Sequence, residues 1–449
     1  MEADVSSLQT AQRLHPATLL QHVVSSLPAL AVLLFFQSAG TEAWISIGTA
    51  VAYGLVALPL IVLRYLRFRY RVEPQEIVIE RGVFNKRHRS IPIERIQNIA
   101  IEQPLLARMV GVAKVTLETA GSTSTEGTLE YVSLQTAHAL RQVVRSYQRE
   151  QDEEATASEE ENARGELLHA MQTGRLALSG LFRFSLLYVA VIFSVLQYVE
   201  PERITNWFRR GALHPLVETA TASPVLAVLT TVVLAVLIGW VTGLAMNVNR
   251  FFDFRLWLDD DKLHKRHGLL TTHERTVPLG KVQALLVRSN PLMRFFGWYR
   301  LEVQTMGIDV QEQGHQVIAP LVNWGEAQAL ADHVYALDAP APMERVSSLT
   351  IRRTFARYSA ALGVVGVVLW YFAGMQALWL LAALPLAGGL AYLQYRYHGY
   401  ALHGDMLYVR RGFFRQHLWA VPVERMQVLY RDASIFQRRL GLRSLHPDT

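Results

Sequence analysis

Three arginines stand at equivalent places in three separated stretches of this 449-residue chain. Arg108, Arg294 and Arg438 each precede a glycine by three residues, inside segments that also share a glutamine. The planar guanidinium donates hydrogen bonds in a fixed fork, which suits a phosphate or a carboxylate. The same fork can instead bind loop carbonyls of its own module. The spacing therefore predicts either an anion site or a structural arginine.

A basic turn with the sequence NKRHRS lies upstream of the first of these arginines. It supplies Lys86, Arg87 and Arg89, and the equivalent stretches supply Arg275 and Arg415. Each basic side chain near an anionic membrane surface contributes about 1 kcal/mol of binding. Together with the three recurring arginines, these residues are the candidate contacts for anionic lipid head groups or for a partner. A solvated charged face is the alternative interpretation.

No pattern of catalytic residues accompanies these side chains. The chain has no cysteine, which excludes a disulfide framework, a thiolate nucleophile and a cysteine-ligated metal. The sequence also lacks HExxH, GxSxG and a phosphate-cradling Gly-Lys-Ser/Thr loop. We therefore predict no catalytic residue, no metal and no cofactor, and we predict that the chain is not an enzyme. The net charge of +6 fits basic flanks of membrane segments, so no nucleic-acid partner is expected.

The arginines belong to a longer repeat with the pattern G-x9-P-x4-Q-x10-R-x2-G. It begins at Gly82, Gly268 and Gly412 and needs no insertion in any copy. Self-similarity of this kind indicates three copies of one structural unit. Alternating apolar and polar residues around each copy predict strands joined by turns. Apolar residues at helical spacing follow at 136–148 and at 324–337, and they predict a closing helix for the first two copies.

Apolar runs precede the three copies in pairs, in a chain of which 51% of the residues are hydrophobic and only 18% charged. About 20 apolar residues are enough to span a bilayer as a helix. We therefore predict six transmembrane helices arranged as three hairpins, with buried core helices of a soluble protein as the alternative. The six runs are 19–36, 44–63, 184–199, 224–246, 358–372 and 378–393.

The basic residues next to these runs predict the orientation. Arg64 and Arg67 follow the second run and Arg352 and Arg353 precede the fifth, whereas the loop at 373–376 has no lysine or arginine. Cytoplasmic flanks of membrane helices are enriched in lysine and arginine. Both termini and the long segments between the hairpins are therefore predicted to be cytoplasmic.

These features divide the chain into hairpins, modules and linkers. We predict transmembrane hairpins at 1–66 and 173–250, and a linker with the third hairpin at 339–396. An acidic linker at 150–172 follows the first module, since its composition disfavours a packed core. The strand-rich modules are predicted at 67–149, 251–338 and 397–449.

The repeated pattern, set between an apolar hairpin and a strand-rich tail, resembles the bacterial pleckstrin-homology-like membrane proteins of the YdbT and YdbS type. The resemblance covers nearly the whole chain as three tandem copies. It implies an α+β integral membrane protein of the bacterial cytoplasmic membrane, with multiple membrane passes. Each hairpin would be followed by a cytoplasmic PH-like module, a bent antiparallel sheet closed by a C-terminal helix. The family implies no catalytic residues.

The third copy contains the whole pattern but stops soon after it, at Thr449. The first two copies continue into further strands and a helix. We expect this module to be incomplete, either through truncation or because another chain completes its sheet. An open sheet edge is a template for pairing and is rarely left bare.

Three classes of function remain open on the sequence. The first is a non-enzymatic membrane scaffold whose modules bind a protein segment, a sister subunit, a second copy or anionic lipid. The second is a transporter or channel component, although such sites usually need polar residues or broken helices inside the membrane. The third is an enzyme acting on lipid or envelope substrates. We favour the scaffold, with the transporter or channel as its alternative.

Overall fold

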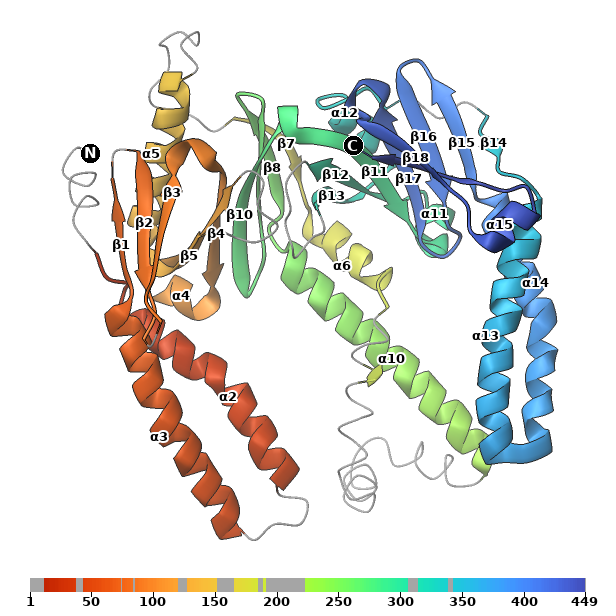
Figure 1. Cartoon of the computed structure of the whole chain (residues 1–449), viewed down its shortest axis with the longest axis horizontal. Helices are drawn as coiled ribbons and strands as arrows, with labels where there is room; N and C mark the ends of the chain where they lie inside the picture. The colour runs from red at the N-terminus through yellow and green to blue at the C-terminus, as the bar shows by residue number, and fades with distance from the viewer. Residues whose placement is uncertain are drawn as a thin grey trace. The chain divides into compact units, whose positions relative to one another are not determined.

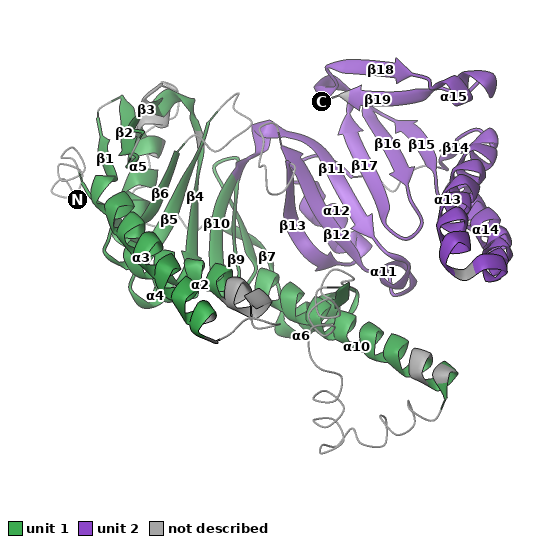
Figure 2. Ribbon diagram, turned by 60° about the horizontal axis from the view of Figure 1, so that its bottom comes forward, with its two compact units in different colours: residues 1–276 green, residues 277–449 purple. Residues whose placement is uncertain are grey.

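The computed structural model describes residues 12–37, 43–73, 75–83, 85–119, 127–151, 165–184, 189–190, 223–305, 314–337 and 342–448. The chain forms two compact units, unit 1 at residues 1–276 and unit 2 at residues 277–449 (Figure 2). Each unit contains a seven-stranded sheet with antiparallel pairing, and each carries long apolar helices (Figure 1). The protein is therefore a mixed α+β structure.

Unit 1 begins with two helices and then alternates short strands with helices. Its helices are α2 (Ala17–Gln37), α3 (Ala43–Arg67), η1 (Ile93–Arg95), α4 (Leu105–Met109), α5 (Leu134–Gln151), α6 (Thr173–Leu181) and α10 (Pro224–Phe251). Its strands are β1 (Arg69–Val72), β2 (Glu76–Arg81), β3 (Arg87–Pro92), β4 (Ile96–Pro104), β5 (Val112–Thr119), β6 (Gly127–Ser133), β7 (Glu166–Ala170), β8 (Arg255–Asp259), β9 (Lys262–His267) and β10 (Thr271–Pro278), the last of which ends just past the unit boundary.

The first repeat forms a core between two layers of strands. Ile77 and Ile91 come from the sheet β1-β2-β3, and Leu117 and Leu129 come from β5 and β6. Leu140 of α5 joins the same cluster of fully buried side chains, so this helix closes the core. The alternation of apolar and polar residues along these strands places one face of each against the other layer. The closing helix predicted at 136–148 is confirmed by α5.

The larger sheet of unit 1 combines two repeats. Its strand order is β6-β5-β4-β10-β9-β8-β7. Strands β4 to β6 come from the second half of the first repeat, whereas β8 to β10 come from the first half of the second repeat. Adjacent repeats are therefore joined edge to edge by hydrogen bonds between β4 and β10.

Unit 2 follows the same plan. Its helices are η2 (Leu279–Lys281), α11 (Pro291–Phe295), α12 (Trp324–Ala331), α13 (Leu349–Ala373), η3 (Gly374–Ala383), α14 (Leu384–Arg396), η4 (Val423–Arg425) and α15 (Ile435–Arg439). Its strands are β11 (Val282–Ser289), β12 (Tyr299–Thr305), β13 (His315–Val322), β14 (Glu344–Arg345), β15 (Gly399–His403), β16 (Met406–Arg411), β17 (Gln416–Pro422), β18 (Val428–Asp432) and β19 (Ser444–Asp448).

The sheet order in unit 2 is β13-β12-β11-β17-β16-β15-β14, with β18 and β19 as a separate pair. Here β11 of the second repeat pairs with β17 of the third. The closing helix predicted at 324–337 is present as the shorter α12, which begins with a capping box between Asn323 and Glu326.

Four helices in the described part of the chain are long and apolar enough to cross a membrane. They cover Ile47–Arg67, Leu229–Phe251, Leu349–Phe372 and Gly374–Arg396, with mean hydropathies of 1.8, 2.1, 1.4 and 1.5. Few of their residues are buried, as expected for surfaces that face lipid. The first predicted run is helical as α2 but is not among the four. Most of the run at 184–199 lies outside the described residues, as does most of the acidic linker.

A short segment before the long apolar helices of each repeat pairs with the strand that follows those helices. Gln12 exchanges two backbone hydrogen bonds with Tyr70, at 2.8 and 3.0 Å. Strand β7 pairs with β8 on either side of α10, and β14 pairs with β15 on either side of α13 and α14. The segments on either side of the long apolar helices are therefore paired with each other in all three repeats.

The third repeat has the strands β18 and β19 at the positions of β4 and β5 in the first repeat. Leu429 of β18 is 60% exposed, whereas Ile99 and Leu285 at the same repeat position are 4% and 0% exposed. The described residues add no further strand or helix to cover β18 and β19.

Candidate functional site: the junctions between repeats

Two junctions join the repeats, and both have the same register. Junction 1 is the pairing of β4 with β10, and junction 2 is the pairing of β11 with β17. Ile101 faces Glu274 in junction 1, and Val287 faces Leu418 in junction 2. Ile101 and Val287 occupy one repeat position, and Glu274 and Leu418 occupy another. One interface is therefore used twice.

The recurring arginines reach across these junctions. Arg108 of α4 donates a hydrogen bond from Nη2 to the hydroxyl of Thr272 on β10. Arg294 of α11 donates from Nη2 to the carbonyl of Phe413 at 2.8 Å, and its guanidinium lies 5.1 Å from the ring centre of Tyr397. The structural alternative placed this bond within the arginine's own module, whereas the partners of these two residues belong to the following repeat. Arg438 does bind its own loop, through the Ala433 carbonyl at 3.2 Å.

Junction 1 contains a carboxylate surrounded by donors. The Oε1 atom of Glu102 lies 3.5 Å from Nδ1 of His273 and 4.0 Å from Nη2 of Arg275, and Oε2 accepts a hydrogen bond from Nζ of Lys114 at 3.1 Å. The hydrogen bond from His273, followed by the charge and hydrogen bond of Lys114, outweighs burial and lowers the pKa of Glu102 to about 2. Glu102 is therefore charged and holds both sides of the junction.

Junction 2 has a basic residue at the position of Glu102. Arg288 faces His417 across the strands, while its Nε binds Oε2 of Glu302 on the neighbouring β12 at 3.0 Å. Burial, followed by the charge of Arg288, lowers the pKa of His417 to about 4. His417 is therefore neutral at pH 7, and the facing pair does not repel.

A glycine turn places β10 at the end of an apolar helix. Gly268 has a φ of +119°, and a Cβ at this position would lie 1.9 Å from the Thr271 carbonyl oxygen. Only glycine fits this backbone without strain. The turn is tied to the C-terminal end of α10, because Gly268 N donates to Phe252 O at 2.8 Å and Leu269 N donates to Asn249 O at 2.9 Å.

The turn after Gly412 has the same position in unit 2. The rings of Phe413 and Tyr397 lie 5.2 Å apart, and Tyr397 directly follows the end of α14. In the first repeat, Arg69 follows the end of α3 closely and pairs with Glu80, so the turn after Gly82 also lies at the helix end. Each glycine turn is thus at the end of a module from which the apolar helices extend.

Exposed apolar side chains form a patch at this end in each unit, and we call these patches lips. Lip 1 joins α4 to the turn after Gly268, and lip 2 joins α11 to the turn after Gly412. Met109 of lip 1 is 79% exposed, and Phe295 of lip 2 is 82% exposed. Large exposed apolar patches mark surfaces for a protein or a membrane. Lip 1 comprises Leu105, Leu106, Met109, Val110, Leu269 and Leu270, and lip 2 comprises Leu292, Phe295, Phe296 and Phe414.

The other predicted basic residues are not gathered into one site. Lys86 and Arg87 are exposed in and after the turn that follows Gly82, and Arg89 is half-buried on β3. Arg415 is exposed in the turn after Gly412. Arg275 is mostly buried within junction 1.

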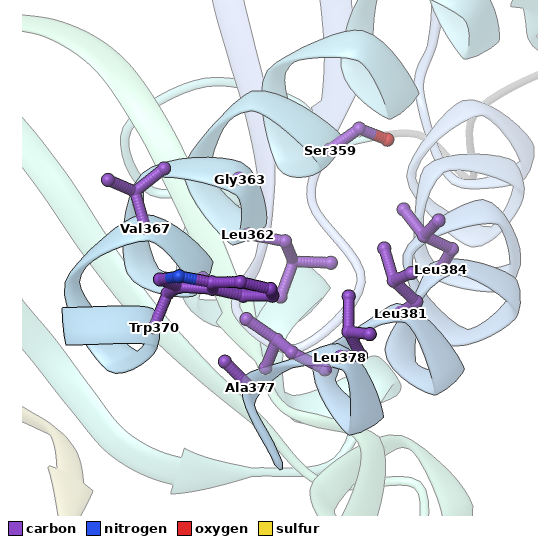
Figure 3. A pocket seen from close by; sticks show the side chains of 11 residues that line it. Ser359, Leu362, Gly363, Val367, Trp370, Ala377, Leu378, Leu381 and Leu384 are labelled. Carbon is purple, nitrogen blue, oxygen red and sulfur yellow. The ribbon is translucent and has the colours of Figure 1, made fainter. Parts of the chain in front are cut away.

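The third hairpin contains an apolar cavity of about 510 Å³ between α13 and η3 (Figure 3). Ser359 supplies the single hydroxyl in its lining, and Trp370 and Leu378 are among the side chains that surround it. A transport or catalytic site would need convergent polar groups. Within the described residues no cluster of three histidine, aspartate or glutamate side chains could hold a metal ion.

Sequence reasoning missed the residues that join the repeats. Thr272, Glu102 and Glu302 were not singled out, because a strand pattern does not say which strand lies beside it. One signal was present: an acidic residue stands at the same repeat position in two copies, as Glu102 and Asp432.

Known proteins resemble this chain over most of its length. The family model described as Bacterial PH domain matches residues 24–148, 219–338 and 356–449. UPF0699 transmembrane protein YdbT of Bacillus subtilis (strain 168) is 23% identical over 416 residues, which are 87% of this chain and 82% of that protein. No solved structure matches the chain.

Proposed function

Because this chain belongs to the bacterial PH domain family and has apolar helices long enough to span a bilayer, we propose that it is a non-enzymatic membrane-anchored scaffold. Its PH-like modules are joined edge to edge by junction 1 within unit 1 and by junction 2 within unit 2, and they present sheet edges and basic turns to partners. The observation that carries this proposal is that apolar helices, glycine turns and lips share one end of the modules in each unit.

The strand pairing around each hairpin supports three hairpins with six spans. A segment that leaves a sheet and returns to it must cross the membrane an even number of times. The helix α10 lies between the paired strands β7 and β8, so its crossing requires a second one between Ala170 and Arg255. The apolar run at 184–199 is our candidate for that crossing. In the same way, the crossing by α3 requires a second crossing, and α2 is our candidate for it.

The distribution of basic residues supports modules and termini on the cytoplasmic side of the bacterial membrane. Arg64 and Arg67 lie in the last turn of α3, and Arg250 and Arg396 end α10 and α14. These positions are at the module end of each helix, where the positive-inside rule places the cytoplasm.

The lips support modules that lie against the bilayer. Apolar side chains at the boundary of head groups and acyl chains anchor a surface through the area that they bury. Lys86 and Arg415 are exposed in turns at this end, so they would meet anionic head groups, with about 1 kcal/mol for each. The bilayer is then both the anchor and a bound surface. Protein partners would add a strand to a free sheet edge.

Site-directed spin labels test this arrangement, since the chain has no native cysteine. Single cysteines at Phe295 in lip 2, Val367 in α13 and Asp405 in the turn between β15 and β16 would be labelled in nanodiscs. We expect the labels at 295 and 367 to be more accessible to oxygen than to a water-soluble nickel complex. The label at 405, at the far end of the module, should show the reverse.

Two outcomes would count against this proposal. A label at 367 that is open to the nickel complex would rule out α13 as a span. A label at 295 that behaves like the one at 405, with and without anionic lipid, would rule out modules that lie on the bilayer.

A further inference from the structure

Two strands in the described part of the chain have a neighbour on one side only, although their equivalents in other repeats have neighbours on both. Strand β18 pairs with β19 on one side, and the described residues place no strand on its other side. Strand β3 pairs with β2 and likewise has no second neighbour within the described ranges. The equivalents of β18 are β4 and β11, and they pair on the corresponding side with β10 and β17, the equivalents of β3.

We propose that β18 of one copy of this chain pairs with β3 of a second copy, in the register of junctions 1 and 2. This inference deepens the proposed scaffold and rests on it, because it names the partner as another copy in the same membrane. The register predicts that Leu429 faces Ser90, Arg431 faces His88, and Asp432 faces Arg87. Copies joined in this way associate head to tail.

Charge complementarity supports this pairing. In junction 1, Glu102 faces His273 and lies close to Arg275. The residues at the same repeat positions are Asp432 on β18 and Arg87 and Arg89 on β3. The proposed junction would therefore again set one carboxylate beside two basic side chains. Opposite charges directly across an antiparallel pair are stabilising.

Strand β18 is accessible along its length. All five residues of β18 are exposed, and Leu429 and Tyr430 are 60% and 55% exposed. The side chain of Asp432 is 67% exposed, although it lies 3.1 Å from His446. An edge strand presents unpaired backbone groups to which another strand can add.

The recurring arginine gives a further link. Arg108 and Arg294 each bind the stretch that follows the glycine turn of the next repeat. Arg438 instead binds the Ala433 carbonyl of its own repeat. In the head-to-tail pair, Arg438 would lie beside the turn after Gly82 of the second copy.

Other pairings of the same edges are less favourable. Two β3 strands side by side would bring Lys86, Arg87 and Arg89 of both copies together, and like charges across a pair are destabilising. The β3-to-β18 pair avoids this repulsion. In addition, β3 starts at the end of its module where α3 ends, as β10 starts at the end of α10, so β3 can pair in the direction that β10 has in junction 1.

Disulfide trapping between two differently tagged full-length copies tests the register. One copy carries Ser90→Cys and the other carries Leu429→Cys, and both are oxidised in native membranes. We expect a disulfide-linked dimer that contains both tags, in at least tenfold higher yield than an off-register control. The control pairs Ser90→Cys with Asp432→Cys, which the register places three residues away, or about 10 Å. A disulfide needs Cα atoms within about 7 Å.

Reversal of the charge at Asp432 provides a second test of the pairing. Asp432→Arg should lower the yield of the Ser90–Leu429 disulfide several-fold, and Arg87→Asp in the other copy should restore it. An unchanged yield in Asp432→Arg would contradict the role of this ion pair.

The failure of this inference is distinguishable from failure of the scaffold. The same membranes are washed with carbonate, and the chain is followed in pellet and supernatant. A chain that stays in the membrane but gives equal in-register and off-register yields, or crosslinks only to a different protein, overturns the pairing and leaves the scaffold standing. A chain that is released by carbonate overturns the scaffold itself.

Discussion

Junctions 1 and 2 share a backbone register but differ in the charges that face each other. Junction 1 places the carboxylate of Glu102 against His273, whereas junction 2 places the guanidinium of Arg288 against His417. The charge of Arg288 is balanced within its own repeat by Glu302. The difference indicates that the paired backbone, the glycine turn and the recurring arginine define the junction. The charged side chains that face each other can differ, provided that a nearby group of opposite charge neutralises each of them.

The largest loss of stability is expected when Glu302 of junction 2 loses the positive charge of Arg288. Arg288→Met would leave Glu302, whose side chain is only 4% exposed, without its guanidinium. Breaking a buried pair in this way costs about 3 kcal/mol or more. Hydrogen exchange of the β11 and β17 amides should show a matching loss of opening free energy, with β4 and β10 unchanged. The exposed Arg431→Met serves as control, and a change below about 0.5 kcal/mol at β17 would contradict the account.

A smaller loss is expected in junction 1. Glu102→Gln removes the charge that accepts hydrogen bonds from His273 and Lys114. Hydrogen bonds to a charged group contribute about 1.5 to 3 kcal/mol. The β4 and β10 amides should lose protection by about 2 kcal/mol, while junction 2 keeps its protection. As a control, the exposed Glu94→Gln should leave the amide protection of both junctions unchanged. If Glu102→Gln lowered the protection of both junctions equally, this would argue against separate junctions.

Acidification should open the two junctions in sequence. His417 has its pKa lowered to about 4, so it stays neutral in the closed junction while the open state takes up a proton near pH 6.5. Its contribution to the stability of junction 2 is complete above pH 6.5 and is lost as the pH falls toward 4. Glu102 has its pKa lowered to about 2, so its contribution is complete above pH 4.5 and is lost as the pH falls toward 2.

Hydrogen exchange, corrected for intrinsic rates, can follow this order. The β17 amides should lose protection between pH 6.5 and 4, before the β10 amides change. The variant His417→Gln should flatten the first transition and leave the second in place. Loss of β10 protection first would reverse the predicted order.

The smallest difference is expected at the recurring arginines. Lysine at 294 would lose the planar contact with Tyr397 as well as the bond to the Phe413 carbonyl, whereas lysine at 108 would lose one hydrogen bond. Cation–π contacts contribute about 0.5 to 1 kcal/mol at exposed sites. Arg294→Lys should therefore weaken its junction by about 1 kcal/mol more than Arg108→Lys does. If both variants lowered the amide protection of their glycine turns equally, the contact with the Tyr397 ring would add nothing to the stability of junction 2.

Repeat-level features were predictable from the sequence because they depend on local patterns. The family resemblance is confirmed, and the repeating glycines at 82, 268 and 412 all have positive φ. The closing helix α5 follows directly from the spacing of apolar residues such as Leu140 and Val144. Four of the six predicted spans are supported by the described residues, and the six-span arrangement stays a prediction.

The junctions were not predictable in the same way. Alternation along 96–104 identifies β4 as a strand, but its neighbour β10 begins at Thr271, beyond a linker and a hairpin. Which edges meet depends on tertiary packing and on the path through the membrane. For this reason the partners of Arg108 and Arg294 in the following repeat were visible only in the structure.

Paired cysteines inside one chain test whether a single register joins successive repeats. Ile101→Cys with Glu274→Cys probes junction 1, and Val287→Cys with Leu418→Cys probes the equivalent positions of junction 2. An engineered protease site between the two cysteines of each pair lets the link be read as fragments that stay together without reductant. Both pairs should link in native membranes, whereas pairs shifted by two residues should not. Fragments that separate in both variants, or shifted pairs that link equally well, would contradict a single register.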